Sequence, residues 1–184
     1  MQDLLGVVLC GGRSSRMGRD KAALPHPGGT TYVHHAIERM REVCDHVCVA
    51  GRCAVSVNVP VLEDAISHQG PMTGILNALA YAAEQGLHAC LVTPVDMPRL
   101  SSQDLLRFRE VWSVHHMICV GRETKSGQTQ PLVAIYPITV TESLASYAQR
   151  DRSLVGWLGQ QSVMEIMLSA DACHNVNTPA DHER

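Results

Sequence analysis

Short apolar runs alternate with amphipathic segments along most of this 184-residue chain. Apolar runs of about four to eight residues are typical of buried strands, whereas apolar residues spaced three and four apart are typical of helices. Strands are predicted at 4–9, 46–50, 59–64, 88–96, 117–121, 131–137 and 163–168, with a polar loop at 121–130. Helices are predicted at 31–44, 72–83, 105–112, 139–149 and 153–160, the third after a capping-box pattern at Ser101 and Asp104. This alternation predicts a three-layer α/β/α fold in which helices cover both faces of a mostly parallel, Rossmann-like sheet.

The size and composition of the chain exclude several classes of protein. The chain is expected to form one domain over 1–184, which is large enough to fold without stabilising disulfides or metal ions. Its formal net charge of −3 argues against a protein that coats nucleic acid. The apolar runs are far shorter than a membrane span, and the N-terminus lacks the pattern of a signal peptide. With 7 cysteines and no CxxC motif, the sequence predicts a cytoplasmic protein.

The first predicted strand runs directly into a glycine-rich, cationic loop, LCGGRSSRMGRDKAAL at 9–24. Gly11 and Gly12 allow backbone N–H groups at a strand end to approach a ligand, and successive free N–H groups form an anion-binding concavity. The loop also carries four cations: Arg13, Arg16, Arg19 and Lys21. It matches neither the Walker A pattern nor the GxGxxG dinucleotide fingerprint. We expect it to bind polyphosphate outside the carboxyl end of the strand, where ligands of such sheets lie.

The same loop resembles the signature LAGGxSxRMGxDKxLL of the MobA-like nucleotidyltransferases, the molybdenum cofactor guanylyltransferases. Later segments resemble further motifs of that family in the same order: VLED at 61–64, GPMTGILNAL at 70–79, TPVDMPRL at 93–100, QPLVAIYP at 130–137 and NVNTPAD at 175–181. The resemblance covers nearly the whole chain. It implies a fold like that of the nucleotide-diphospho-sugar transferases, with a nucleotide-binding N-terminal half and an acceptor-binding C-terminal half.

The reaction that the resemblance implies is the transfer of GMP from GTP to the phosphate of molybdopterin, with release of pyrophosphate. The implied partners are GTP, molybdopterin and, transiently, molybdoenzymes or their chaperones, with no nucleic acid and no membrane. The segment LCGG at 9–12 favours GTP, because the cytidylyltransferase branch resembles LAAG at this point. Two alternatives remain open: a transferase of the same fold that uses CTP or another phosphorylated acceptor, and a non-catalytic nucleotide-binding protein.

The resemblance also assigns roles in the N-terminal half. Lys21 and Arg16 are expected to face the triphosphate as catalytic residues, and Asp64 to accept hydrogen bonds from the nucleoside. Asp96 is expected to hold a catalytic Mg²⁺, with Mn²⁺ as the alternative ion, because it follows an apolar strand and lies at the carboxyl end of the sheet. The implied nucleotide site comprises Leu9, Cys10, Gly11, Gly12, Arg16, Lys21, Asp64 and Asp96.

Four residues of the C-terminal half are implied for acceptor binding: Gln130, Arg152, Asn175 and Asn177. Asn175 and Asn177 point to the same side of an extended segment, and each amide can both donate to and accept from a pterin edge. The alternative for this pair is an Asx-turn. The chain departs from the family at VAGRC, 49–53, where Gly51 or Arg52 stands near an Asn that contacts the nucleotide in many members.

Overall fold

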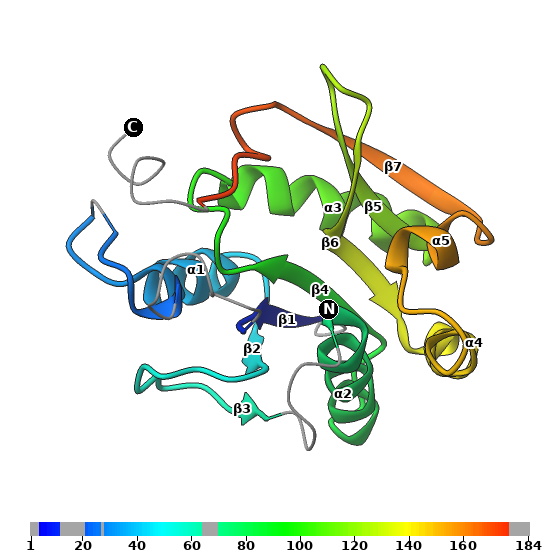
Figure 1. The fold of residues 1–184 in the computed structure, drawn as a ribbon, viewed down its shortest axis with the longest axis horizontal. Coiled ribbons are helices and arrows are strands. Elements are labelled where there is room, and N and C mark those ends of the chain that lie inside the picture. Colours follow the sequence, from blue (N-terminus) through cyan, green and yellow to red (C-terminus); the bar gives the residue numbers. More distant parts are fainter. Residues whose placement is uncertain (1–3, 12–20, 27, 64–69, 177–184) are drawn as a thin grey trace.

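The computed structural model describes residues 4–11, 21–26, 28–63 and 70–176 (Figure 1). The strands are β1 (Leu4–Leu9), β2 (His46–Ala50), β3 (Val61–Leu62), β4 (Ala89–Pro94), β5 (Ile118–Glu123), β6 (Thr129–Pro137) and β7 (Val163–Leu168). The α-helices are α1 (Tyr32–Arg41), α2 (Pro71–Glu84), α3 (Ser102–His115), α4 (Thr141–Ala148) and α5 (Leu154–Leu158). Two short 3-10 helices are η2 (Lys21–Ala23) and η3 (Ile138–Val140).

The described strands form one seven-stranded sheet in the order β3-β2-β1-β4-β6-β5-β7. Strand β6 is antiparallel to both β4 and β5, and the remaining neighbours are parallel. The reversal follows from chain connectivity, because β5 and β6 are joined by a loop of residues 124–128, too short for the crossover that a parallel pair needs. The predicted mostly parallel sheet is therefore confirmed.

Helices cover both faces of this sheet (Figure 1). On one face α1 and α3 pack against the strands and bury side chains such as Met40 and Phe108. On the other face α2, α4 and α5 do the same with side chains such as Leu79 and Trp157. Side chains alternate across a strand, so central strands such as β1 and β4 contribute to both halves of the core. This arrangement confirms the predicted three-layer α/β/α fold.

Two predicted elements differ from the structure. The strand predicted at 59–64 is only two residues long, because Pro60 has no N–H and cannot donate to the ladder. The polar segment 121–130, predicted as a loop, is largely the end of β5 and the start of β6. Its polar side chains lie on an exposed face of the sheet, where Arg122 forms an ion pair with Glu165 of β7 at 2.5 Å. The end of β5 and the start of β6 were therefore not predicted, because their residues are polar.

The cysteines of the chain are free thiols, and several lie in the core. Burial raises the pKa of both Cys44 and Cys48 to about 12, and it also raises the pKa of Cys90 strongly. These thiols stay protonated at neutral pH and pack as small apolar side chains. Of the helices in the described ranges, none has the length and apolar character needed to cross a membrane.

Candidate active site

Several parallel strands end side by side at one edge of the sheet. Leu9 at the end of β1 lies opposite Ala50 of β2 on one side and Pro94 of β4 on the other. Ala50 in turn lies opposite Leu62 of β3. These four strand ends are therefore neighbours in space, although up to about 85 residues separate them in sequence. A ligand at this edge can contact all of them.

The ends of β1 and β2 pass unusually close to each other. The N–H of Cys10 donates to the carbonyl of Ala50 at 2.9 Å, and Gly51 has a φ of +96°. A Cβ atom at Gly51 would lie 2.1 Å from the carbonyl oxygen of Cys10, so this position accepts only glycine. The VAGRC segment thus contains one position, Gly51, at which the backbone of Cys10 leaves no room for a side chain. Gly11, with a φ of +98°, is exposed beside the backbone of Arg52.

The structure brings Lys21 and Asp96 together at this edge. The Nζ atom of Lys21 lies 2.7 Å from Oδ2 of Asp96, across 75 residues of sequence. Lys21 begins η2, whose middle residue Ala22 is fully buried, and Asp96 lies two residues after the end of β4. Their side chains are 19 % and 22 % exposed, so the pair is open to solvent on one side. A lysine and a carboxylate, both reachable by a ligand, are suited to a metal-bound triphosphate.

The C-terminal segment after β7 is bonded to the same loop. The N–H of Val176 donates to the backbone carbonyl of Asp96 at 2.9 Å. Val176 and Ala172 are buried against the core, and Arg99 forms an ion pair with Asp171. Asn175, predicted to bind the acceptor, is therefore held next to Asp96 with its own residue exposed to solvent. This places a predicted acceptor residue beside the predicted metal ligand.

The remaining predicted acceptor residues are less closely connected to this edge. Gln130 is half-buried on β6 opposite Gly121, at the end of β6 that points the same way as the carboxyl end of β4. Arg152 is exposed in the turn between α4 and α5, and those helices pack on the opposite face from the C-terminal segment. Within the described ranges, no contact joins Arg152 to Asp96 or Asn175. Four further predicted site residues lie outside the described residues: Gly12, Arg16, Asp64 and Asn177.

The Asp96 side chain fits a divalent cation that takes most of its ligands from a nucleotide. Its Oδ2 atom pairs with Lys21, whereas no described residue donates to Oδ1. In the part of the chain that the structure describes, no three His, Cys, Asp or Glu side chains form a group that could hold a metal. One carboxylate completed by phosphate and water oxygens is a common way to bind Mg²⁺. These residues therefore fit the predicted ion without forming a cage of their own.

Two side chains of α1 that the sequence analysis missed contact the loop after Asp96. Arg39 donates from Nη1 to the carbonyls of Met97 at 3.0 Å and Leu100 at 2.6 Å. His35, one turn earlier, hydrogen-bonds to the carbonyl of Pro98. The available signal was an arginine on the apolar stripe of a predicted helix, between Ala36 and Val43 in helical spacing.

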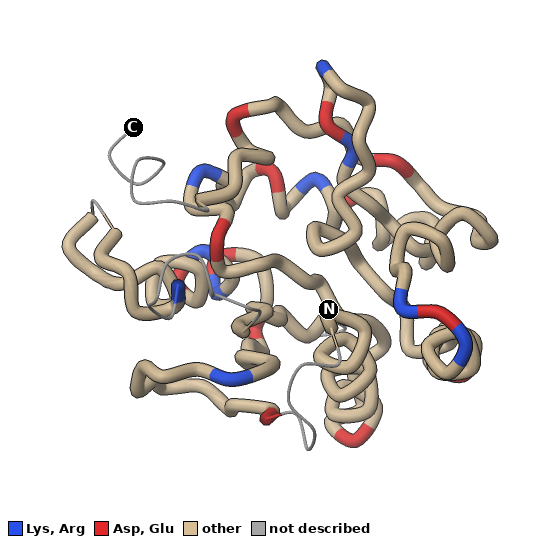
Figure 2. Tube along the Cα trace, viewed as in Figure 1, with Lys and Arg blue, Asp and Glu red and all other residues tan. Residues whose placement is uncertain are grey.

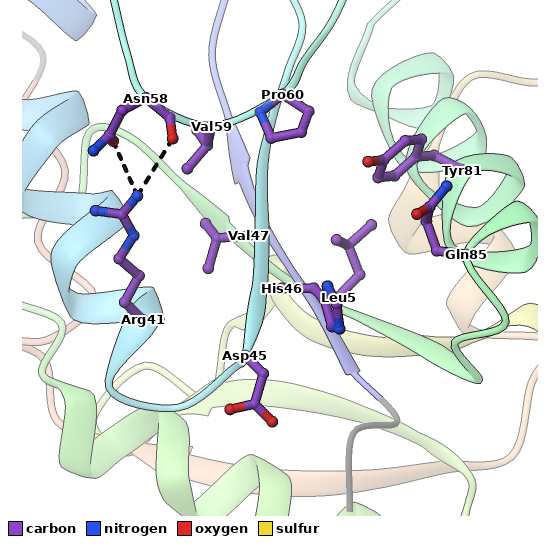
Figure 3. Close-up of a pocket in the computed structure, with 10 residues that line it drawn as sticks. All are labelled: Leu5, Arg41, Asp45, His46, Val47, Asn58, Val59, Pro60, Tyr81 and Gln85. Atoms are coloured by element: carbon purple, nitrogen blue, oxygen red, sulfur yellow. Dashed lines mark hydrogen bonds between the residues drawn. The ribbon is translucent and has the colours of Figure 1, made fainter.

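A separate pocket of about 240 Å³ lies near the amino ends of β1 and β2, at Leu5 and His46 (Figure 3). Arg41 lines one wall and donates to both the carbonyl and the Oδ1 oxygen of Asn58. Tyr81 of α2 lines the opposite wall. Among the predicted site residues that the structure describes, none lines this pocket, and the pocket lies at the opposite end of the strands from Asp96. We therefore assign the candidate active site to the carboxyl edge.

The charges of the described residues are interspersed along the chain (Figure 2). At the carboxyl edge, the described cation that pairs with Asp96 is Lys21. A three-layer α/β/α fold with a lysine–carboxylate pair at the carboxyl edge of its sheet has the architecture of an enzyme that acts on a nucleoside triphosphate. The family model for the MobA-like NTP transferase domain matches residues 6–165, and the chain belongs to that family.

Known proteins agree with this assignment. A protein of Rhodopirellula baltica named "Probable molybdenum cofactor guanylyltransferase" is 40% identical over 97% of this chain and 89% of its own length. The structure of molybdopterin-guanine dinucleotide biosynthesis protein A from Archaeoglobus fulgidus matches with a TM-score of 0.76 at 18% identity, over 98% of this chain and 95% of that one. A Mycobacterium tuberculosis protein solved in complex with manganese matches with a TM-score of 0.64 at 21% identity, over 92% and 89%. Both structures share the fold of this chain.

Proposed function

We propose that this protein is a molybdenum cofactor guanylyltransferase, which transfers GMP from GTP to the phosphate of molybdopterin and releases pyrophosphate. The observation that carries the proposal is the pair of Lys21 and Asp96 at 2.7 Å, with the Asn175 segment bonded to the backbone of the same aspartate. A nucleotide-side cation, a metal ligand and an acceptor-side amide thus meet at one edge. The name of the Rhodopirellula baltica relative at 40% identity supports the choice of nucleotide and acceptor.

Lys21 and Asp96 act together on the triphosphate. Without a nucleotide each side chain neutralises the other, which keeps two half-buried charges paired. With GTP bound, Lys21 would pair with phosphate oxygens, which would leave the Asp96 carboxylate available to a divalent cation. Such a cation would neutralise negative charge on the phosphates during transfer. We propose Mg²⁺ as that ion, and the manganese bound to the Mycobacterium tuberculosis relative supports a divalent cation.

The acceptor phosphate must approach the α-phosphate in line with the leaving pyrophosphate. The hydrogen bond from Val176 to the carbonyl of Asp96 holds the C-terminal segment next to the strand ends. Asn175 can therefore orient an acceptor beside the metal-bound triphosphate. Gln130 on β6 is a second acceptor contact at the same end of the sheet. We retain Arg152 and Asn177 as further acceptor residues. In this arrangement the N-terminal half holds the nucleotide and the C-terminal half holds the acceptor.

The proposal is tested first by nucleotide binding. GTP with Mg²⁺ at about 100 times its Kd should add about 2.7 kcal/mol to the stability of the folded protein. For a chain of this size that corresponds to a rise in Tm of about 5–10 °C. CTP with Mg²⁺ should give a much smaller rise. A larger rise with CTP would instead support the cytidylyltransferase alternative.

Turnover is the second test. Purified protein, molybdopterin, GTP and Mg²⁺ should release pyrophosphate and form the guanine dinucleotide, whereas omission of molybdopterin should abolish both. Binding of GTP without any pyrophosphate release in the complete mixture would support the non-catalytic alternative. Release with another phosphorylated acceptor in place of molybdopterin would retain the reaction type and change the acceptor.

A further inference from the structure

The loop that carries Asp96 ends in a tight turn. The N–H of Leu100 donates to the carbonyl of Met97 at 3.4 Å, so 97–100 forms a β-turn with Pro98 at its second position, where proline is favoured. Met97 and Leu100 are 3 % and 1 % exposed and anchor both ends of the turn in the core. A turn fixed at both ends limits the directions that the preceding residue, Asp96, can take.

Arg39 of α1 is a buried cation that hydrogen-bonds to this turn. Its residue is 5 % exposed, and one nitrogen, Nη1, donates to the carbonyls of both Met97 and Leu100. Burial lowers the pKa of Arg39 to about 10, and the nearby Asp104 carboxylate opposes that change. The guanidinium is therefore still charged at neutral pH. Its Nε and Nη2 atoms have no hydrogen-bond partner among the described residues.

A buried arginine at this position of α1 stabilises the fold less than an apolar side chain would, because its charge loses its hydration. A buried cation that lacks a carboxylate partner is disfavoured unless carbonyl oxygens compensate it. The two carbonyls that do so here are both in the turn after Asp96, and His35 bonds to a third, that of Pro98. With the bond from Val176 to the carbonyl of Asp96, four backbone carbonyls of 96–100 accept hydrogen bonds from elsewhere in the protein.

We propose that Arg39 is a positioning residue for Asp96: its guanidinium fixes the turn at 97–100 and thereby holds the Asp96 carboxylate toward the divalent cation of the bound nucleotide. The proposal rests on the proposed function, in which Asp96 holds that cation. Arg39 touches neither the nucleotide nor the acceptor. Its effect is on the geometry of one metal ligand, in the way that outer groups orient metal ligands in general.

The experiment compares Arg39→Met and Arg39→Lys with a matched control, Arg109→Met. Arg109 also reaches from a helix to a backbone carbonyl, that of Val43. Three quantities are measured: hydrogen exchange of the peptide covering 95–101 in the ligand-free protein, the Mn²⁺ affinity by EPR with a non-hydrolysable GTP analogue, and the affinity for that analogue without metal.

Arg39→Met should accelerate exchange in 95–101 at least about tenfold and weaken Mn²⁺ binding about tenfold to hundredfold. Affinity for the metal-free analogue should stay within about twofold of wild type. Arg39→Lys should have an exchange rate and a Mn²⁺ affinity between those of wild type and Arg39→Met. An ammonium can donate to one or both carbonyls but lacks the planar fork of a guanidinium. Arg109→Met should leave all three quantities near wild type.

The proposal is overturned if Arg39→Met binds Mn²⁺ as tightly as Arg109→Met does, or if metal-free binding falls by the same factor as Mn²⁺ binding. If Arg39→Met does not fold, Arg39→Lys decides on the same criteria: wild-type exchange and wild-type Mn²⁺ affinity in that variant overturn the proposal. Wild-type protein that binds no Mn²⁺ with the analogue contradicts the proposed function instead, and the exchange measurement then still decides whether Arg39 fixes the turn.

Discussion

Replacement of Asp96 by asparagine separates the charge of this side chain from its size. Asparagine keeps an oxygen that can accept from Nζ of Lys21, which is now 2.7 Å from Oδ2, but it removes the negative charge. The two side chains are 19 % and 22 % exposed, so solvent still screens part of their attraction. The loss of the pair should therefore lower the free energy of unfolding by only about 1 kcal/mol, at the upper end for partly exposed pairs.

A loss of that size cannot by itself reduce turnover much. Domains are stable by about 5–15 kcal/mol, so well over about 99% of the variant would remain folded at 25 °C. Removal of one preorganised charge from a catalytic site, in contrast, typically lowers kcat by about 100-fold or more. Asp96→Asn should thus unfold in urea almost like wild type and lose at least about 100-fold in GMP transfer.

The assay is steady-state pyrophosphate release at saturating GTP, molybdopterin and Mg²⁺, combined with urea unfolding of the same preparation. Glu38→Gln is the matched control, because it removes the exposed pair between Glu38 and Arg41 at 2.8 Å and lies away from the carboxyl edge. It should change neither quantity appreciably. Near-normal turnover of Asp96→Asn would refute the assignment of the metal ligand. A fall of several kcal/mol in its stability would show instead that the aspartate is structural.

Three other variants test the remaining parts of the site. Lys21→Ala should weaken binding of GTP and of a GDP–metal complex, whereas guanosine binding, measured by calorimetry, should barely change. Equal weakening of all three would show that the loop had collapsed. Gly51→Ala should cost about 2–5 kcal/mol in urea unfolding, from a left-handed φ and the contact with a carbonyl, whereas Gly86→Ala, with φ +69° and open space around it, should cost about 1–2 kcal/mol; equal costs would contradict the crowding argument. Asn175→Ala combined with Asn177→Ala should raise the KM for molybdopterin about ten- to hundredfold and leave the Kd for GTP within about twofold, and a parallel loss of GTP affinity would mean that these asparagines only form a turn.

Local periodicity in the sequence was enough to predict most of the fold. The runs at 4–9 and 46–50 coincide with β1 and β2, because a strand buried on both faces must be apolar throughout. The run at 163–168 coincides with β7, an edge strand in which Glu165 and Met167 are exposed. The capping box predicted at Ser101 and Asp104 is present at the start of α3, since a cap depends on residues three apart. The family motifs carried the prediction of Lys21 and Asp96, each of which lies at the end of a recognisable segment.

Contacts across long stretches of sequence were decided only by the tertiary structure. Periodicity reports which face of an element is buried but not which element covers it, so the place of β6 between β4 and β5 was not predictable. The same holds for the approach of Lys21 to Asp96 across 75 residues and for the bond from Val176 to that aspartate. Arg39 is the clearest case. In sequence it is a cation on an apolar stripe, and only the packing of α1 against the turn at 97–100 gives its charge two carbonyl partners.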